Sequence, residues 1–315
     1  MIPYIIRRFL IAIPVLLGIT FITFAIIHLA PGDPIRMMLA TEKITPAVAD
    51  HLTTYYGLDK PWYVQYATYI GNLLRGDLGI SITTRTSVSD SIKQRLPNTM
   101  LLAFSSMFLA LLIAIPIGII SATRRNSLAD YLSMTGAMIG VSMPNFWLGL
   151  LLLLLFGLRW KMLPIWGIGS LGNGLWDFLS HLIMPSITLG TGLAALLTRL
   201  TRASLMEVLS EEYIRTARAK GLRERIVLYK HALRNALIPV TTTAGIQFGA
   251  LLGGAFIVES IFSWPGMGRL ALQGIQKRDL PIIQGTTLVF AVCFVLVTLL
   301  VDILYVFIDP RIRYD

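Results

Sequence analysis

The spacing of charged residues constrains this chain more than any other feature of its sequence. Six stretches, each longer than 20 residues, contain no Asp, Glu, Lys or Arg. A helix of about 20 apolar residues crosses the bilayer core, where the backbone must satisfy its own hydrogen bonds. We therefore predict an all-α polytopic membrane protein with six transmembrane helices. The uncharged stretches are residues 9–32, 96–123, 131–158, 178–198, 235–258 and 280–301.

The composition excludes several classes of protein. Charged residues make up 14% of the chain and hydrophobic residues 55%, whereas soluble domains carry about 25% charged residues. A soluble enzyme, a nucleic-acid-binding domain and a disordered chain are all excluded on this ground. The net charge of +10 predicts attraction to anionic lipid of the inner leaflet, and no nucleic acid partner is needed. The only cysteine, Cys293, excludes an intrachain disulfide.

The distribution of Lys and Arg predicts the orientation in the membrane. With a cytoplasmic N-terminus, the inner segments hold 15 of these cations and the short outer loops hold 5. The positive-inside rule therefore places both termini in the cytoplasm. The first apolar stretch follows Arg7 and Arg8 but is too long for a signal peptide, so we interpret it as an uncleaved anchor. The predicted location is a prokaryotic cytoplasmic (plasma or inner) membrane, crossed several times.

Three domains are expected along the chain. Residues 1–30 form the first transmembrane helix, and residues 96–315 form a five-helix core with a cytoplasmic loop at 199–235. Between them, residues 31–95 are the only segment large enough to fold outside the membrane, and we predict a helical extracytoplasmic insertion there. This insertion is either a lid that fills space between headgroups and subunits or a platform for a substrate-donating protein.

The insertion carries signals for three helices. Thr45-Pro46 predicts the start of one that ends before Gly57, and Lys60-Pro61 opens a second over 61–75, closed by Gly76. Ser87 predicts the cap of a third, short helix that ends before Pro97.

Motifs for catalysis are absent from the sequence. No glycine is followed by Lys, so a Walker A phosphate loop cannot be present, and zinc-protease, Cys-x-x-Cys and Gly-x-Ser-x-Gly patterns are missing. His28, His181 and His231 lie near the ends of spans without clustered ligands, so no metal site is predicted. We expect no catalytic residue, no metal and no cofactor bound by this chain.

Polar groups within the spans are few and nearly all neutral. No carboxylate or cation lies in the middle of a span, so ion-coupled transport lacks its usual carriers, although the carbonyls of broken helices can still bind ions. A polar path would be lined by neutral side chains and by a glutamate near a span end. The candidates are Ser142, Asn145, Ser186, Thr188, Thr242, Gln247 and Glu259.

Small residues in the fifth span allow another helix to approach closely. Gly249, Gly253 and Gly254 give the small-x-x-x-small spacing of such contacts. The contact serves either packing within this chain or an interface with another subunit.

The cytoplasmic loop 199–235 has the clearest local signals. Ser210 is expected to cap a short helix whose first turn holds Glu211 and Glu212, and Gly221 is expected to end it. Ala217 and Gly221 fall on one face with Tyr213, so this small face should permit close approach of a partner. A second, basic helix over residues 223–234 then leads into the fifth span.

The segment Glu212–Leu222, followed by His231–Pro239, resembles the EAA loop of ABC importer permeases in its dipeptide and oligopeptide form. Ala217, Gly221 and Leu233 match the general pattern, whereas Arg215 and Thr216 replace a Glu and an Ala. His231 and Arg234 also depart from the pattern, and all four departures are usual in the peptide branch. Matching motifs elsewhere include Pro31–Pro34, Gly76–Gly79, Pro144–Trp147, Phe262–Arg269 and Asp309–Arg311.

This resemblance implies the type I importer permease fold and a set of partners. The chain would pair with a second homologous permease, two cytoplasmic ATPases would grip the loop, and an extracytoplasmic substrate-binding protein would deliver peptide. Only the ATPases would use ATP and Mg, and the permease would touch membrane lipid. The residues that would couple to the ATPases are Glu212, Tyr213, Arg215, Thr216, Ala217, Arg218, Lys220, Gly221 and Leu222.

Alternatives to a peptide importer remain open at the level of sequence. Importers of nickel chelates and of oligosaccharides share this permease architecture. A passive channel or secondary transporter would move substrate without ATPases, and a membrane enzyme or scaffold would need a catalytic constellation that the spans lack.

Overall fold

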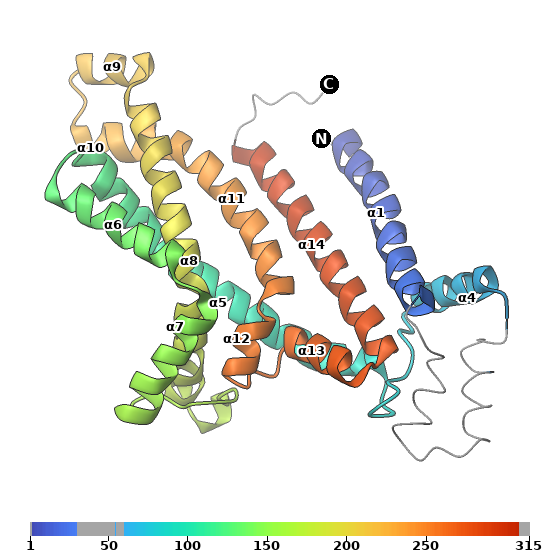
Figure 1. Ribbon diagram of the computed structural model, residues 1–315. Helices are drawn as coiled ribbons and strands as arrows, with labels where there is room; N and C mark the ends of the chain where they lie inside the picture. The colour runs from blue at the N-terminus through green and yellow to red at the C-terminus, as the bar shows by residue number, and fades with distance from the viewer. Residues whose placement is uncertain (1, 30–53, 55–59, 309–315) are drawn as a thin grey trace. The chain divides into compact units, whose positions relative to one another are not determined.

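The computed structural model describes residues 2–29, 54 and 60–308 (Figure 1). All regular structure in this part is helical, and its β contact is an isolated antiparallel bridge between Ile80 and Ser87. The all-α fold is confirmed. The helices are α1 (Ile2–Leu29), α4 (Trp62–Leu74), α5 (Val88–Thr123), α6 (Leu128–Ser142), α7 (Asn145–Leu152), the π-helix η1 (Leu153–Arg159), the 3₁₀-helix η2 (Leu171–Asn173), α8 (Leu175–Leu209), α9 (Glu212–Ala219), α10 (Glu224–Ile226), the π-helix η3 (Val227–Ala232), α11 (Leu233–Gly254), α12 (Phe256–Ile261), α13 (Met267–Lys277) and α14 (Leu280–Ile308).

Five of the six predicted spans have helices of sufficient length and apolarity. Four are single helices within the described residues: α5, α8, the continuous run Glu224–Gly254 and the Leu280–Val301 part of α14. The fifth is a bent pair formed by α6 and the helix that follows it. The first predicted span falls in α1, a 28-residue helix whose described apolar stretch is Leu10–Ala25. At about 1.5 Å per residue, α1 is longer than the hydrocarbon core of about 30 Å.

The third span differs from the continuous helix that its uncharged stretch predicts. Leu128–Ser142 and Asn145–Arg159 meet at an angle of 98°. Pro144 has no N–H to donate, and its ring disfavours the helical conformation of Met143, which is extended with φ −82° and ψ 117°. The bend therefore follows from the proline.

The chain divides into two compact units, which are described separately. The larger one consists of Met1–Arg8, Arg95–Leu270 and Val292–Asp315. The predicted domain boundaries at residues 30 and 95 stay a prediction. In the larger unit, buried side chains of α5, α8 and α11 form the core, among them Leu102, Leu197 and Leu252. Two helices approach closely at Gly118, where a Cβ would lie 2.6 Å from the Cβ of Thr201, so α5 packs directly on α8.

Of the three glycines singled out in the fifth span, one serves packing within the chain. A Cβ on Gly249 would lie 2.9 Å from the ring of Phe294 in α14, so α11 needs glycine here to approach α14. Gly253 and Gly254 have nothing within 4 Å of such a Cβ in the described residues. The close approach within one chain is therefore confirmed for Gly249 alone.

The smaller unit consists of Phe9–Gln94 and Ala271–Ala291, and in it α4 packs on α1. Tyr66 of α4 makes an edge contact with Phe21, and its hydroxyl lies 3.0 Å from Thr20 Oγ1. The predicted helix 61–75 is confirmed as Trp62–Leu74, and Gly76 follows with a φ of +77°. Apart from Thr54, the helix predicted over 45–56 lies outside the described residues.

The third predicted helix of the insertion is longer than expected. It starts at Val88 as predicted, with Ser87 Oγ accepting from the Asp90 N–H at 3.3 Å, but it continues through Pro97 to Thr123. The prediction that it ends before Pro97 is wrong. A proline at this position leaves the carbonyl of Lys93 without its helical donor, and Lys93 is exposed, so water can bond this carbonyl.

Candidate functional site

The short helix predicted in the cytoplasmic loop is α9. Its predicted N-terminal cap is wrong, because Ser210 still belongs to the end of α8 and its hydroxyl donates to the Glu207 carbonyl at 2.6 Å. Glu211 occupies the N-cap position with an extended backbone and no side-chain cap bond. A serine caps a helix only when its own backbone is extended, and Ser210 has helical angles of φ −89° and ψ −8°.

The predicted C-terminal stop at Gly221 is confirmed. Gly221 has a φ of +74°, and its N–H donates to the Arg218 carbonyl at 2.9 Å. The N–H of Leu222 reaches back to the Ala217 carbonyl at 3.4 Å. These two bonds form the Schellman motif, in which glycine adopts the left-handed conformation without a steric penalty. The end of α9 is therefore fixed by local chemistry.

One face of α9 is buried against its own chain. Ile214 is 0% exposed and Ala217 8%, and both join a group of apolar side chains that we call the α9 cluster. Ala217 therefore does not present a small face to a partner together with Gly221, as the sequence led us to expect, because it fills space within this chain. The α9 cluster comprises Ile119 and Ala122 of α5, Leu205 of α8, Ile214 and Ala217 of α9, Val227 and Ala232 of η3, and Ala236 of α11.

Polar contacts tie α9 to the helix that follows it. Arg218 holds Glu224 through two bonds, Nη2 to Oε1 at 2.7 Å and Nε to Oε2 at 3.2 Å. The Asn235 side-chain amide donates to the Tyr213 hydroxyl at 2.8 Å. These contacts lie on the surface. The hydrogen bonds to the Glu224 carboxylate raise the pKa of the Arg218 guanidinium. They orient the loop, while the α9 cluster supplies the buried area that holds it in place.

The other predicted coupling residues lie on the exposed side of the loop. A partner that approaches α9 meets charged, polar and backbone groups there. It also meets two large side chains that the sequence analysis did not single out, Ile226 and Tyr229, which are 40% and 58% exposed. The sequence feature that could have pointed to Tyr229 is the presence of an aromatic residue within the basic segment 223–234. The exposed predicted residues are Glu212, Tyr213, Arg215, Thr216, Arg218, Lys220, Gly221 and Leu222.

An ion pair between a partly exposed arginine and a buried carboxylate joins α6 to α8 in the same unit. Arg202 donates to both carboxylate oxygens of Asp130, at 2.7 and 2.8 Å, and Ser121 of α5 donates to the same carboxylate at 2.5 Å. No local sequence pattern predicts this contact, because 72 residues separate the two charged partners. Three helices are thereby locked near the turn that connects α5 to α6.

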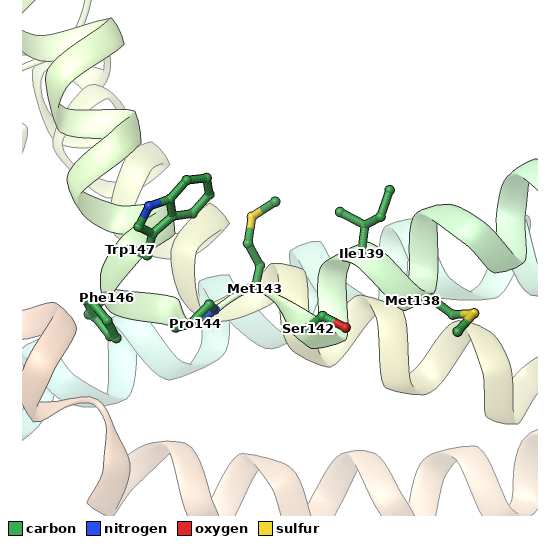
Figure 2. A pocket seen from close by; sticks show the side chains of 7 residues that line it. All are labelled: Met138, Ile139, Ser142, Met143, Pro144, Phe146 and Trp147. Atoms are coloured by element: carbon green, nitrogen blue, oxygen red, sulfur yellow. The ribbon is translucent and has the colours of Figure 1, made fainter.

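Two predicted pathway residues lie at the bend of the third span. Ser142 and Asn145 flank Pro144 and are exposed. Ser142 contributes to an open pocket of about 540 Å³, in which Ile139, Met143 and Trp147 project to the same side (Figure 2). The pocket is mainly apolar, and its full lining is Met138, Ile139, Ser142, Met143, Pro144, Phe146 and Trp147.

Ser186 and Thr188 of α8 do not lie on an open surface. Both are buried, Ser186 hydrogen-bonds Ser105 of α5 at 2.8 Å, and Thr188 donates to the Met184 carbonyl of its own helix. In the described structure they act in helix packing instead of lining a path. Thr242 and Gln247 of α11 are half-buried, and Thr242 likewise donates to its own helix at the Ile238 carbonyl.

Glu259 of α12 likewise does not lie on an open surface of the described structure, because it is 0% exposed. Its carboxylate accepts from Thr99 Oγ1 at 2.7 Å and from the Arg269 backbone N–H at 2.8 Å. Thr99 in turn accepts from the Met267 N–H at 2.7 Å. Burial raises the pKa of the Glu259 carboxyl, and these hydrogen bonds oppose that shift. Glu259 therefore fixes the turn between α12 and α13 to the start of the transmembrane part of α5.

The same turn is held by a tryptophan and by small residues. The Trp264 indole donates to the Asn98 carbonyl at 3.0 Å, and the Asn98 amide donates to the Pro265 carbonyl at 2.9 Å. Gly266 lies so close to the Glu259 carboxylate that a Cβ would overlap with it. The segment Phe262–Arg269, which carried part of the resemblance, is thus a closely packed turn. We call it and its contacts with Asn98, Thr99 and Glu259 the Glu259 turn.

Groups that could hold a metal ion are absent from the described residues. No three His, Cys, Asp or Glu side chains gather there. His181 bonds within its own helix, with Nδ1 2.8 Å from the Asp177 carbonyl. The expectation of no metal, no cofactor and no catalytic residue stays a prediction.

The fold and the loop define a component of a membrane transport system, and family comparisons agree. The model described as "binding-protein-dependent transport system inner membrane component" matches residues 114–314. The model of the N-terminal part of such components matches residues 1–103. The chain belongs to this family and is therefore a multi-pass protein of the inner membrane.

Curated relatives match over the whole chain and are permease subunits. The oligopeptide transport system permease protein AppB of Bacillus subtilis is 45% identical over 317 residues, covering 100% of both chains. The dipeptide transport system permease protein DppB of Escherichia coli (strain K12) is 41% identical over 337 residues, covering 100% of this chain and 99% of the relative. The glutathione transport system permease protein GsiC of the same strain is 45% identical over 314 residues, covering 100% of both. This chain is accordingly a permease subunit of an ABC importer.

Solved structures support the type I importer permease fold. A chain of the inward-facing MetNI methionine ABC transporter matches with a TM-score of 0.55 at 19% identity, covering 69% of this chain and 96% of that chain. A chain of an amino acid ABC transporter crystallised with histidines matches with a TM-score of 0.51 at 16% identity, covering 71% and 95%. At these identities the likeness concerns the fold alone.

Proposed function

We propose that this chain forms one half of the conduit of an ATP-driven importer for dipeptides and oligopeptides. The observation that carries the proposal is α9, a capped helix with one face seated on the α9 cluster and the other exposed. Relatives whose names specify oligopeptides, dipeptides and glutathione support a peptide substrate. Nickel chelates and oligosaccharides are the alternative cargoes.

The proposed assembly contains four kinds of partner. A second homologous permease forms the other half of the conduit, two cytoplasmic ATPases bind α9, an extracytoplasmic binding protein delivers substrate, and lipid surrounds the spans. ATP and Mg are used by the ATPases alone, so this chain has no catalytic site of its own. Both termini lie in the cytoplasm, as the excess of Lys and Arg in the inner segments indicates.

The α9 cluster explains how movement of the ATPases would reach the conduit. Ile214 and Ala217 of α9 pack with side chains from the ends of α5, α8 and α11. Close-packed interiors transmit displacement instead of absorbing it. When the ATPases close on nucleotide and shift α9, the attached helix ends shift with it and bias the conduit between its outward-open and inward-open states.

The bend of the third span supplies a candidate contact for cargo. Its pocket combines apolar side chains with the hydroxyl of Ser142, and Asn145 lies exposed beside it. Such a surface tolerates peptide side chains of varied chemistry, because apolar contact is non-directional. We place Ser142 and Asn145 on the path and exclude Ser186, Thr188 and Glu259.

The substitution Gly221→Arg tests the proposal in the assembled transporter. Arginine at a φ of +74° strains the Schellman motif and adds bulk to the exposed side of α9. We expect normal insertion and assembly but peptide uptake reduced about tenfold or more per ATP hydrolysed. The measurement is uptake of labelled dipeptide and ATP hydrolysis in proteoliposomes that contain both permeases, the ATPases and the binding protein.

Gly221→Asn is the matched control, because asparagine tolerates the left-handed conformation and adds less bulk. It should retain most of the coupled uptake. Coupled uptake by the Gly221→Arg variant at the wild-type rate would contradict the role of α9. Uptake by the wild-type chain without ATPases would instead identify a passive channel.

A further inference from the structure

A loop in the smaller unit is held by a buried carboxylate from a distant part of the chain. The bridge between Ile80 and Ser87 closes this segment, which we call the 80–87 loop. Asp279, in the turn between α13 and α14, is 0% exposed and accepts hydrogen bonds from the loop. The three donors are Ser81 Oγ at 2.5 Å, the Thr83 N–H at 2.9 Å and the Ile82 N–H at 3.3 Å.

The loop is also bonded within itself. Ser81 Oγ accepts from the Thr84 N–H at 3.0 Å and from its hydroxyl at 2.8 Å, and the Arg85 N–H donates to the Ser81 carbonyl at 2.9 Å. The hydroxyls of Thr84 and Thr86 lie 2.7 Å apart. A loop fixed in this way loses little conformational entropy when it binds a partner. Its tip is therefore preorganised.

The tip presents a cation in a strained conformation. Thr84, Arg85 and Thr86 are exposed, and Arg85 has a φ of +56°, which glycine adopts far more readily than arginine. No salt bridge to Arg85 exists among the described residues. Strain of this kind, held by the surrounding structure, is typical of recognition sites. The Arg85 guanidinium is therefore exposed to solvent and forms no ion pair that would stabilise the described part of the unit.

The surface around the loop has an excess of positive charge. The turn that carries Asp279 ends α13 with the exposed cations Lys277 and Arg278. The exposed acids in the flanking segments are Asp77, which caps the Gly79 N–H, and Asp90, which lies 3.9 Å from Lys93. Because Asp279 joins the two segments, exposed cations of both lie in the smaller unit near this contact, and their charge suits an acidic partner.

We propose that the 80–87 loop is the docking surface for an acidic patch on the extracytoplasmic binding protein, with Arg85 as its principal contact. This inference rests on the proposed function. The loop belongs to the segment 31–95, which the distribution of Lys and Arg predicts to be extracytoplasmic. Charged contacts orient an encounter and speed association without making it permanent, which suits a protein that must leave after delivery.

The test uses the complete transporter in lipid nanodiscs, titrated with its own binding protein loaded with dipeptide. ATP hydrolysis is measured at each concentration, which gives the half-stimulating concentration of the binding protein. We expect Arg85→Glu to raise this concentration about tenfold, with the basal rate and the maximal rate unchanged. Between about 50 and 200 mM salt, the wild-type value should rise, whereas that of the variant should change little.

Two further variants sharpen the result. Lys60→Glu makes the same change of charge at an exposed position at the other end of α4 and should shift the value less than about twofold. Asp279→Asn keeps Arg85 but weakens the bonds to the loop, and it should produce an intermediate rise.

Three outcomes overturn the inference. In the first, Arg85→Glu and Lys60→Glu have equal effects. In the second, removal of anionic lipid from the nanodisc shifts the wild-type value as Arg85→Glu does, which would assign the loop to lipid headgroups. In the third, ATP hydrolysis by the wild-type complex is not stimulated by its binding protein. This outcome would overturn the proposed function as well. It differs from the other two because the wild-type complex itself does not respond.

Discussion

The α9 loop and the Glu259 turn are both closely packed parts of the larger unit, but they are held by opposite kinds of contact. Under α9, the buried contacts are apolar, and the polar bonds such as Arg218 to Glu224 lie at the surface. In the Glu259 turn, a fully buried carboxylate accepts bonds from Thr99 and from the Arg269 backbone. The first arrangement is non-directional, whereas the second requires each donor at its position.

This difference indicates different mechanical roles. A shift of apolar contacts leaves no polar group unsatisfied, so α9 can be displaced together with the helix ends that pack against it. A buried charge that loses one hydrogen bond in a dry environment is strongly destabilised, so the Glu259 turn should resist displacement. We infer that the Glu259 turn keeps its position in the unit (the fixed end) and that α9 is the part that an external partner can move (the handle).

The largest effect is expected from Glu259→Gln. Glutamine keeps one acceptor for Thr99 but turns an amide donor toward the Arg269 N–H, which leaves a buried donor unsatisfied. The free energy of unfolding should fall by about 3 kcal/mol. The measurement is the temperature at which half of the detergent-solubilised complex loses its monodisperse elution, together with the yield of folded protein.

Thr99→Ser is the control for this prediction, because it keeps the hydroxyl that donates to Glu259 and accepts from Met267. It should lie close to the wild type. If Glu259→Gln matched the wild type in yield and in thermal midpoint, the directional description of this turn would be wrong.

The contrast between the two regions also decides what the sequence could predict. The end of α9 was predictable because its signal is local, with Gly221 adopting the positive φ that ends the helix. Ser210 was not, because the same residue type either caps α9 or ends α8, and only the backbone angles decide. The bonds from Thr99 to Glu259 and from Ser81 to Asp279 were not predictable, since they join positions 160 and 198 residues apart.

The pathway candidates illustrate the same limit. Ser142 and Ser186 are both neutral serines in predicted spans, and nothing local distinguishes them. Burial against Ser105 removes Ser186 from an open surface, and the bend at Pro144 exposes Ser142. The proline was visible in the sequence, but an uncharged stretch of sufficient length for one span outweighed it.

A smaller effect is expected from Ile214→Ala, which removes the only 0% exposed side chain of α9 in the α9 cluster. The loss of buried methylene groups and the cavity left behind should reduce the free energy of unfolding by about 2 kcal/mol. The loss should be local, so hydrogen exchange over residues 211–222 should accelerate while exchange in α5 stays unchanged.

Thr216→Ala is the matched substitution on the exposed side of α9, where the hydroxyl bonds only the Glu212 carbonyl of its own helix. It should leave exchange nearly unchanged. Equal acceleration in both variants would indicate that α9 is not held by its buried face.

The smallest effect is expected from Arg218→Ala. The pair with Glu224 has good bidentate geometry, but the side chains are 42% and 64% exposed, so water and salt screen the attraction. The free energy of unfolding should fall by about 0.5 kcal/mol, and the difference should vanish at about 1 M salt. Thermal midpoints of wild type and Arg218→Ala at low and high salt measure this. A salt-independent loss as large as that of Ile214→Ala would mean that the polar contacts, and not the apolar cluster, hold α9, and the distinction between handle and fixed end would then fail.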